Sequence, residues 1–193
     1  LLRYIAVSYF NDALKRAEEI TKASAQEPEQ LYGEFRRIMR LVNPLTNFEE
    51  YDKQIFKILG QSHYRIWEAN IKDQSEALIS NDYFQRVLII DPDDCDAILN
   101  LVILHYNQGV YKIRSIDINT DIGQLIPIQD SAIRNFTTAL PYAEKCFRTC
   151  PPSVESYKGL MYCNRAIGKE ELYLELKNDL EQKIRSGEIK TGK

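Results

Sequence analysis

Residues 82–110 read DYFQRVLIIDPDDCDAILNLVILHYNQGV, and this run decides the fold. Apolar side chains recur at helical spacing as far as Asp91-Pro92, and a second helical stripe begins at once and ends at Gly109. A proline ends a helix readily because it lacks the backbone N–H that the helix interior needs. The run therefore predicts a helix, a tight turn and a second helix, which together form one unit of a helical array.

The same period continues on both sides of this run. Asn47, with Glu50 three residues later, has the spacing of a capping box and marks one further helix start. The apolar stripes predict eight helices, over residues 2–22, 27–43, 47–70, 73–90, 94–108, 129–149, 153–167 and 170–184. The sequence thus predicts an all-α protein, with a single helical domain over residues 1–185 and a frayed polar tail over 186–193.

One segment departs from the helical period. Residues 113–129 read IRSIDINTDIGQLIPIQ, alternate locally between apolar and polar side chains, and contain Gly123 and Pro127. We expect a loop insertion over residues 112–128. A loop of this length inside a compact domain is often functional or mobile. It either contacts a partner or is a tolerated insertion.

Composition narrows the class of protein. Of the 193 residues 44% are hydrophobic and 27% are charged, with a net charge of −3. The absence of an apolar run of 18 residues predicts no membrane span, and the acidic balance gives no reason to expect nucleic acid as a partner. The chain begins with Leu1 rather than Met, so the expected location is cytoplasmic or, if an upstream leader was removed, periplasmic.

The reactive side chains do not form a recognisable catalytic pattern. The four cysteines, at positions 95, 146, 150 and 163, include no C-x-x-C pair, and we expect them to be small apolar residues of a helical core. His63 and His105 fall at apolar helical positions and are expected to be core histidines. No nucleophile turn or glycine-rich phosphate loop is present. We therefore expect no enzyme activity, no metal and no cofactor.

Self-similarity between segments carries the strongest functional signal. One unit has Ile98, Leu101 and Val102 on its first helix and Gly109 at its turn. The next unit has Tyr157, Leu160, Met161 and Asn164, with Gly168 at its turn, and the preceding unit has Phe56, Leu59, Gly60 and His63. Proline follows the second helices at Pro92 and Pro151, and more weakly at Pro44. In these positions the chain resembles the tetratricopeptide repeat (TPR) family. The resemblance covers units 47–93, 94–152 and 153–185, preceded by a divergent helix pair over 1–46.

Residues 136–173 also resemble the terminal repeat of Bacteroidetes-type TPR proteins. The resemblance implies a right-handed α-solenoid whose concave face binds a peptide or a segment of another protein. The positions implied to face this groove are Lys57, Gln61, Tyr64, Leu99, Asn100, Ile103, Tyr106, Lys158, Tyr162 and Arg165. Glu155 and Gly159 stand where carboxylate-binding members of the family have cations, so a carboxylate clamp is not expected.

A second reading of the same features is structural. The helical array then serves as a structural or oligomerising piece of a longer protein and associates with itself through its first helix pair and the apolar end of its last helix. Light scattering of the isolated chain discriminates between these two readings, because a monomer at all concentrations removes the second.

Overall fold

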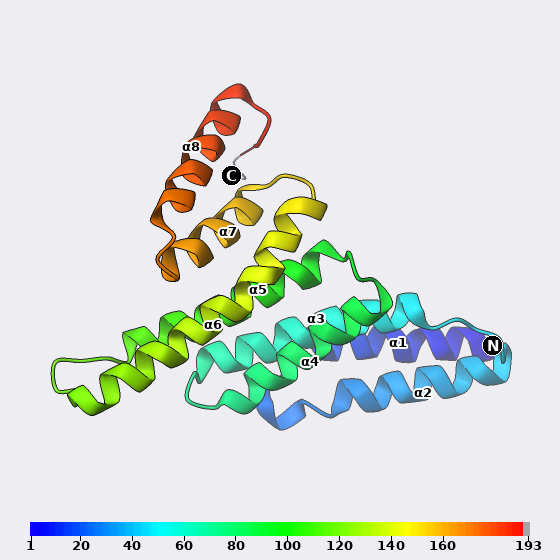
Figure 1. Cartoon of the computed structure of the whole chain (residues 1–193). Helices are drawn as coiled ribbons and strands as arrows, with labels where there is room; N and C mark the ends of the chain where they lie inside the picture. The colour runs from blue at the N-terminus through cyan, green and yellow to red at the C-terminus, as the bar shows by residue number, and fades with distance from the viewer. Residues whose placement is uncertain (191–193) are drawn as a thin grey trace. The chain divides into compact units, whose positions relative to one another are not determined.

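A computed structural model describes residues 1–190 and confirms the all-α class. The described residues contain eight α-helices, one short 3₁₀ turn and no strand (Figure 1). The chain divides into two compact units, Leu1–Pro92 (unit 1) and Asp93–Lys193 (unit 2), where the sequence predicts a single domain. The boundary follows Pro92, the proline that the sequence places between two helix pairs.

Unit 1 consists of two helical hairpins (Figure 1). Its elements are α1 (Leu2–Glu18), the 3₁₀ turn η1 (Lys22–Ser24), α2 (Glu27–Val42), α3 (Glu49–Ala69) and α4 (Gln74–Ile90). Aromatic rings fill the core between α1, α2 and α3. Phe35 is fully buried, and its ring centroid lies 5.0 Å from that of Phe10 and 4.9 Å from that of Tyr51. The apolar stripes predicted in 1–70 therefore converge on one core.

The capping box predicted for Asn47 and Glu50 is not formed, because Phe48 is the N-cap of α3 and makes no side-chain cap hydrogen bond. The Asn47 side chain accepts a hydrogen bond from the backbone N–H of Glu49 at 2.9 Å and donates one to the Glu49 carboxylate at 3.1 Å. Glu50, the predicted capping partner, instead lies 3.3 Å from Lys53 in an ion pair. The helix begins at Glu49, two residues after Asn47.

The α3–α4 hairpin is packed through a glycine. A Cβ atom on Gly60 would lie 2.8 Å from the Phe84 ring, and the Ser80 hydroxyl donates to the Gly60 carbonyl at 2.7 Å. The same hairpin buries a polar pair, in which His63 Nδ1 lies 2.6 Å from Glu76 Oε2. His63 is therefore a satisfied core residue, as the sequence predicts.

Unit 2 consists of α5 (Cys95–Arg114), α6 (Ile122–Thr149), α7 (Val154–Ala166) and α8 (Glu170–Ser186). Side-chain caps are present at the starts of α5 and α7. Asp94 accepts from the Ala97 N–H at 3.0 Å, and Ser153 and Ser156 form a reciprocal capping box at the start of α7. Val102, Tyr157 and Leu160 belong to one buried cluster that joins α5, α6, α7 and α8.

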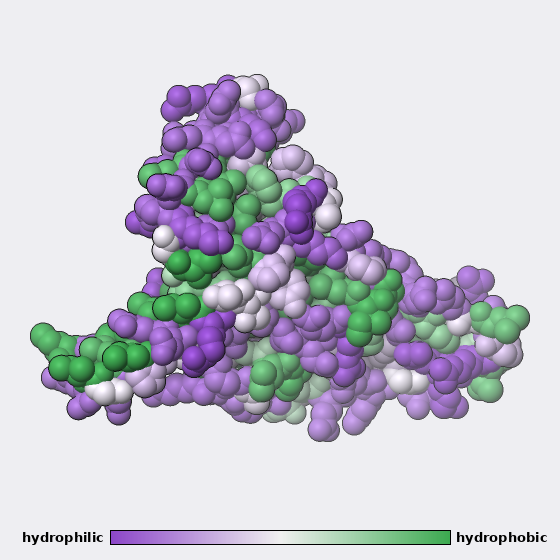
Figure 2. Space-filling view, in the orientation of Figure 1, coloured by the Kyte–Doolittle hydropathy of each residue, from purple (hydrophilic) through white to green (hydrophobic). Residues whose placement is uncertain are grey.

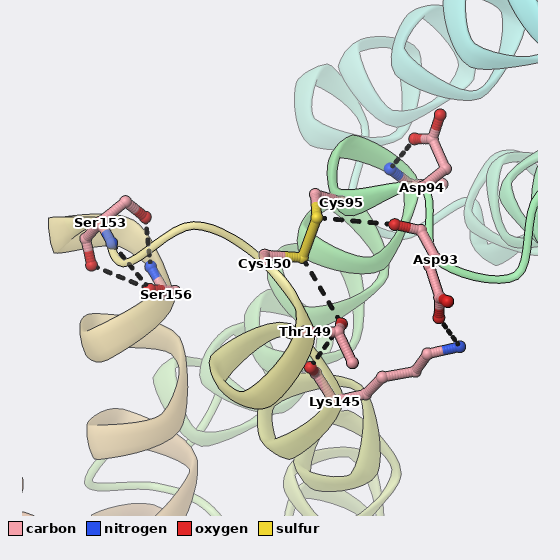
Figure 3. Close-up of a disulfide and its surroundings, with 9 residues drawn as sticks. Asp93, Asp94, Cys95, Lys145, Thr149, Cys150, Ser153 and Ser156 are labelled. Carbon is pink, nitrogen blue, oxygen red and sulfur yellow. Dashed lines mark hydrogen bonds and ion pairs between the residues drawn. A yellow bond between two sulfur atoms is a disulfide. The ribbon is translucent and has the colours of Figure 1, made fainter.

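The cysteines correct one expectation. Cys95 at the start of α5 and Cys150 directly after α6 form a disulfide, with their Cα atoms 5.6 Å apart (Figure 3). Only Cys146 and Cys163 are free and buried, as expected for core residues. The sequence does not show this pairing, because the two cysteines are 55 positions apart and no local spacing connects the two ends of an antiparallel hairpin.

The predicted loop over 112–128 is also corrected. α5 continues to Arg114 and α6 begins at Ile122, so the connection is only residues 115–121. The Asp121 carboxylate accepts from the Gly123 N–H at 2.6 Å and caps α6. Pro127 and Pro141 both lie inside this helix. Gly123, Pro127 and the local alternation of apolar and polar residues led to the prediction of a loop where packing against α5 supports a helix.

Gly109 has a different role from the predicted one. It lies inside α5 and not at a turn, and a Cβ atom there would come 2.4 Å from the Phe136 ring of α6. Gly109 and Phe136 therefore correspond to Gly60 and Phe84 of unit 1. The glycine allows the close approach, and the ring of the opposite helix occupies the space.

The segment after α8 does not fray at its beginning. Gly187 adopts a left-handed conformation with φ of 81°, which ends the helix. Ile189 is then buried, and its N–H donates to the Lys183 carbonyl at 3.2 Å. Of the predicted tail over 186–193, residues 191–193 lie outside the described residues.

Candidate functional site

Two tyrosines from different helices define the candidate site of unit 2. Tyr106 of α5 and Tyr162 of α7 stack with ring centroids 6.1 Å apart and planes inclined by 28°. Tyr162 remains 39% exposed, and Tyr106 is half-buried. The pair thus presents aromatic surface and phenol groups to solvent from a fixed position.

A hollow of about 200 Å³ lies on one side of this pair, between α5 and α7; we call it the α5/α7 hollow. It is lined by Leu99, Val102, Ile103, Tyr106 and Asn107 of α5 and by Glu155, Lys158, Gly159 and Tyr162 of α7. Its walls are mainly apolar, with Glu155 and Lys158 as the charged lining residues. Such a surface suits an apolar side chain flanked by polar contacts.

A second and larger hollow, of about 660 Å³, shares both tyrosines; we call it the three-helix hollow. It is lined by Tyr106, Val110, Ile113 and Arg114 of α5, by Gln129, Ile133 and Phe136 of α6, and by Tyr162, Arg165 and Ala166 of α7. The ten lining residues include two arginines and neither Asp nor Glu. The hollow is therefore apolar with a positive rim.

The electrostatics of the tyrosine pair reflect this rim. Burial raises the pKa of Tyr106, and the positive charges of Arg165 and Arg114 oppose that rise. Arg165 also lies 4.9 Å above the Tyr173 ring and 3.6 Å from the Glu170 carboxylate. Both members of this ion pair are more than half exposed, so water screens the attraction and the arginine remains accessible to a ligand.

A close backbone approach positions α7 beside α5. A Cβ atom on Gly159 would lie 3.2 Å from Val102, so α7 contacts α5 at a residue without a side chain. The disulfide holds the start of α5 against the connection that leads into α7, and the Asp93–Lys145 ion pair at 3.2 Å lies beside it (Figure 3). These contacts fix the end of the α5/α7 hollow nearest the disulfide.

The structure places the ten predicted groove residues in both units. Leu99, Ile103, Tyr106, Lys158 and Tyr162 line the α5/α7 hollow, and Arg165 lines the three-helix hollow. Asn100 is half-buried, and its side-chain amide donates to the Asp96 carbonyl at 2.8 Å. Lys57, Gln61 and Tyr64 share one face of α3 in unit 1. Their assignment as groove residues stays a prediction.

The sequence reading missed much of the three-helix hollow. Arg114 lies within the segment predicted as a loop, Gln129 lies next to it, and Ile133 lies in the helix predicted over 129–149 but was not named as a groove residue. A signal was present, because Ile122, Ile126 and Ile133 follow a helical period after the capping residue Asp121. Gly123, Pro127 and the local alternation of residues favoured a loop instead.

The remaining reactive groups have structural surroundings. His105 stacks on Tyr142 with centroids 6.0 Å apart, and burial lowers the pKa of its imidazole. Burial raises the pKa of the Cys163 thiol to about 12 and that of Cys146 in the same direction. Among residues 1–190 no group of three or more His, Cys, Asp or Glu side chains is arranged to hold a metal ion.

Comparison with known proteins adds no relative. No model of a protein family, no curated protein and no solved structure matches this chain. Within the described residues, no helix combines the length and the apolar character required to cross a membrane.

Proposed function

We propose that this protein is a non-catalytic, TPR-like module of the right-handed α-solenoid type, which binds a peptide or a segment of another protein. The binding surface is the pair of hollows on either side of Tyr106 and Tyr162. The Tyr106–Tyr162 stack is the observation that carries the proposal. Tyrosine is enriched at binding hot spots because its rigid ring gives large contact area and its hydroxyl gives a polar anchor.

The walls around the tyrosines support this role. Leu99 is half-buried and Ile103 is 38% exposed, so both present apolar surface that a partner would cover. Lys158 and Arg165 supply positive charge along α7. Apolar centres with a charged rim are the usual composition of protein interfaces.

A capture experiment tests the proposal. A photo-reactive amino acid is placed at Ile103, and the cross-linked partner is recovered from the native organism and identified. Tyr162→Ala and Lys158→Glu are expected to weaken binding of that partner roughly ten-fold or more, the size of a hot-spot loss. Tyr4→Ala is the matched control, since Tyr4 is 83% exposed on α1 of unit 1. Equal binding by all three variants would remove the hollows as the binding surface.

Self-association is the second candidate, favoured by the apolar surface of α1. Leu2, Ile5 and Val7 are 51%, 39% and 42% exposed on this helix. A second copy would cover this surface in a structural or oligomerising role. Light scattering over a hundred-fold range of concentration tests it: a dimer that Val7→Asp disperses supports this candidate, and a monomer throughout rules it out.

A further inference from the structure

One face of α6 carries a long apolar seam. Its first half consists of Ile122, Ile126, Gln129, Ile133 and Phe136, separated by steps of four and three residues in turn. The same steps continue through Leu140, Ala143 and Phe147. All but Gln129 are apolar. This spacing is typical of a helix face that packs lengthwise along another helix.

The second half of the seam already has a helical partner. Leu140, Ala143 and Phe147 belong to the buried cluster that includes α7, and the Phe147 ring lies 4.9 Å from the ring of Tyr157. α7 has 13 residues whereas α6 has 28, so α7 ends before the seam does. The three-helix hollow opens where α7 ends, since its last residues line it.

Three isoleucines of the first half lack such cover, whereas Phe136 is buried against Gly109 and Tyr106 of α5. Ile122, Ile126 and Ile133 are 77%, 62% and 46% exposed. Figure 2 shows apolar side chains gathered at this end of the α5–α6 hairpin. Residues 122–136 extend over roughly 22 Å of helix, at 1.5 Å per residue. Large apolar side chains exposed along one helix face are typical of an interaction site.

Charge specifies what kind of segment fits this face. Arg114 and Arg165 are the charged residues that line the three-helix hollow, and they come from α5 and α7. No lining residue is an acid. A partner segment over the seam would therefore place its own carboxylates near these guanidinium groups, which hold carboxylates in bidentate geometry.

We infer that the exposed half of the α6 seam, with Arg114 and Arg165, binds an acidic amphipathic helix of about four turns from another protein. This helix covers Ile122, Ile126 and Ile133 as α7 covers Leu140, Ala143 and Phe147. The inference rests on the proposed function and adds the form and charge of the partner. The commitment to a helix comes from α7, which occupies the continuation of the same seam.

Selection from a display library of random sixteen-residue peptides tests the inference without a known partner. Peptides selected on the intact chain are expected to carry apolar residues at helical spacing and several Asp or Glu residues. Selection on the variant Arg114→Glu with Arg165→Glu is expected to lose that acidic preference. Selected peptides that are basic, or rich in proline and extended, would overturn the inference.

Direct binding of one selected acidic peptide locates the surface. Ile126→Asn combined with Ile133→Asn is expected to raise the Kd about ten-fold or more, measured by fluorescence anisotropy. Ile89→Asn is the control, because Ile89 is 80% exposed on α4 of unit 1 and should leave the Kd unchanged. Circular dichroism of each variant checks that the helices remain.

The outcomes separate this inference from the proposed function. A selected peptide whose binding depends on Leu99 and Tyr162 but not on Ile126 and Ile133 overturns the inference and leaves the proposed function standing. A dimer of the chain that the same isoleucine variants disperse assigns the seam to a second copy and also overturns the inference. If the photo-reactive residue at Ile103 captures no partner while the peptide still binds at the seam, the result counts against the proposed binding surface at the α5/α7 hollow. The inference about the seam then stands.

Discussion

Phe136 of α6 lies so close to Gly109 of α5 that a Cβ atom on the glycine would come within 2.4 Å of its ring. Phe84 lies over Gly60 in unit 1 in the same way, with a closest approach of 2.8 Å. Two hairpins with little sequence in common thus use one packing device. In each, glycine on the first helix admits an aromatic ring from the second, which brings the two helix axes close together.

Substitution of this glycine should destabilise unit 2. Gly109→Ala is expected to lower the free energy of unfolding by about 1–3 kcal/mol, because the new methyl group has to displace the Phe136 ring. Gly33→Ala in α2 is the control, since no atom lies within 4 Å of its would-be Cβ. Alanine there should raise the free energy of unfolding by about 1 kcal/mol. Urea unfolding measures the free energy of unfolding of both variants. An equal change in the two variants would disprove the prediction.

Loss of the disulfide should also destabilise unit 2. The bond joins residues 55 positions apart, so it restricts the unfolded chain strongly. Cys95→Ser combined with Cys150→Ser is expected to lower the free energy of unfolding by roughly 2–4 kcal/mol. Reductant should have the same effect on the parent protein and none on the double variant. Thermal unfolding of both proteins with and without reductant measures this loss of stability. A reductant effect on the double variant would contradict the assignment of the Cys95–Cys150 disulfide.

The number of free thiols should depend on where the protein is made. Disulfides persist in oxidising compartments and are rare in a reducing cytosol. Protein from an oxidising compartment is expected to carry two alkylatable thiols after denaturation, Cys146 and Cys163. Protein from a reducing cytosol should carry four. Mass spectrometry after iodoacetamide treatment counts them, and four thiols in both preparations would show that the bond does not form.

His105 should make stability depend on pH. Burial lowers the pKa of this imidazole in the folded protein, whereas the unfolded chain protonates near pH 6.5. As the pH falls, the unfolded chain therefore binds a proton at His105 before the folded protein does. The neutral, buried imidazole thus stabilises the fold above about pH 6.5, and this stabilisation is lost as the pH falls from there through the folded pKa. His105→Phe keeps a ring against Tyr142 and should remove this component. The free energies of unfolding of the parent protein and of the variant are measured between about pH 7.5 and 5.5. If the difference between them stays constant over this range, the prediction is wrong.

The buried His63 and Glu76 side chains should contribute to the stability of unit 1 as a coupled pair. His63→Leu leaves the Glu76 carboxyl buried without its 2.6 Å partner and is expected to lower the free energy of unfolding by roughly 3–5 kcal/mol. Combining it with Glu76→Leu should recover part of that loss, since no unpaired polar group remains. A double-mutant cycle in urea measures the coupling. Additive losses would mean that the two side chains act independently.

Local patterns were sufficient wherever a helix depends on its own residues. The apolar period and the turn at Asp91-Pro92 predicted α4 and α5, and the Asp94 cap lies where that turn ends. The predicted groove residues Tyr106 and Tyr162 do meet, because each lies on a well-predicted helix. Helical spacing is a short-range property, so a sequence reports it directly.

Only the tertiary structure decided the features that join distant residues. The Cys95–Cys150 bond closes a hairpin whose length no local spacing reveals, and the α6 start at Ile122 depends on packing against α5 that outweighs Pro127. The half-covered seam likewise follows from the unequal lengths of α6 and α7. Sequence alone determined the all-α class and the approximate positions of the helices, whereas contacts between segments decided where α6 begins, which cysteines pair and which apolar face stays open. These features depend on energies shared between residues far apart in the chain.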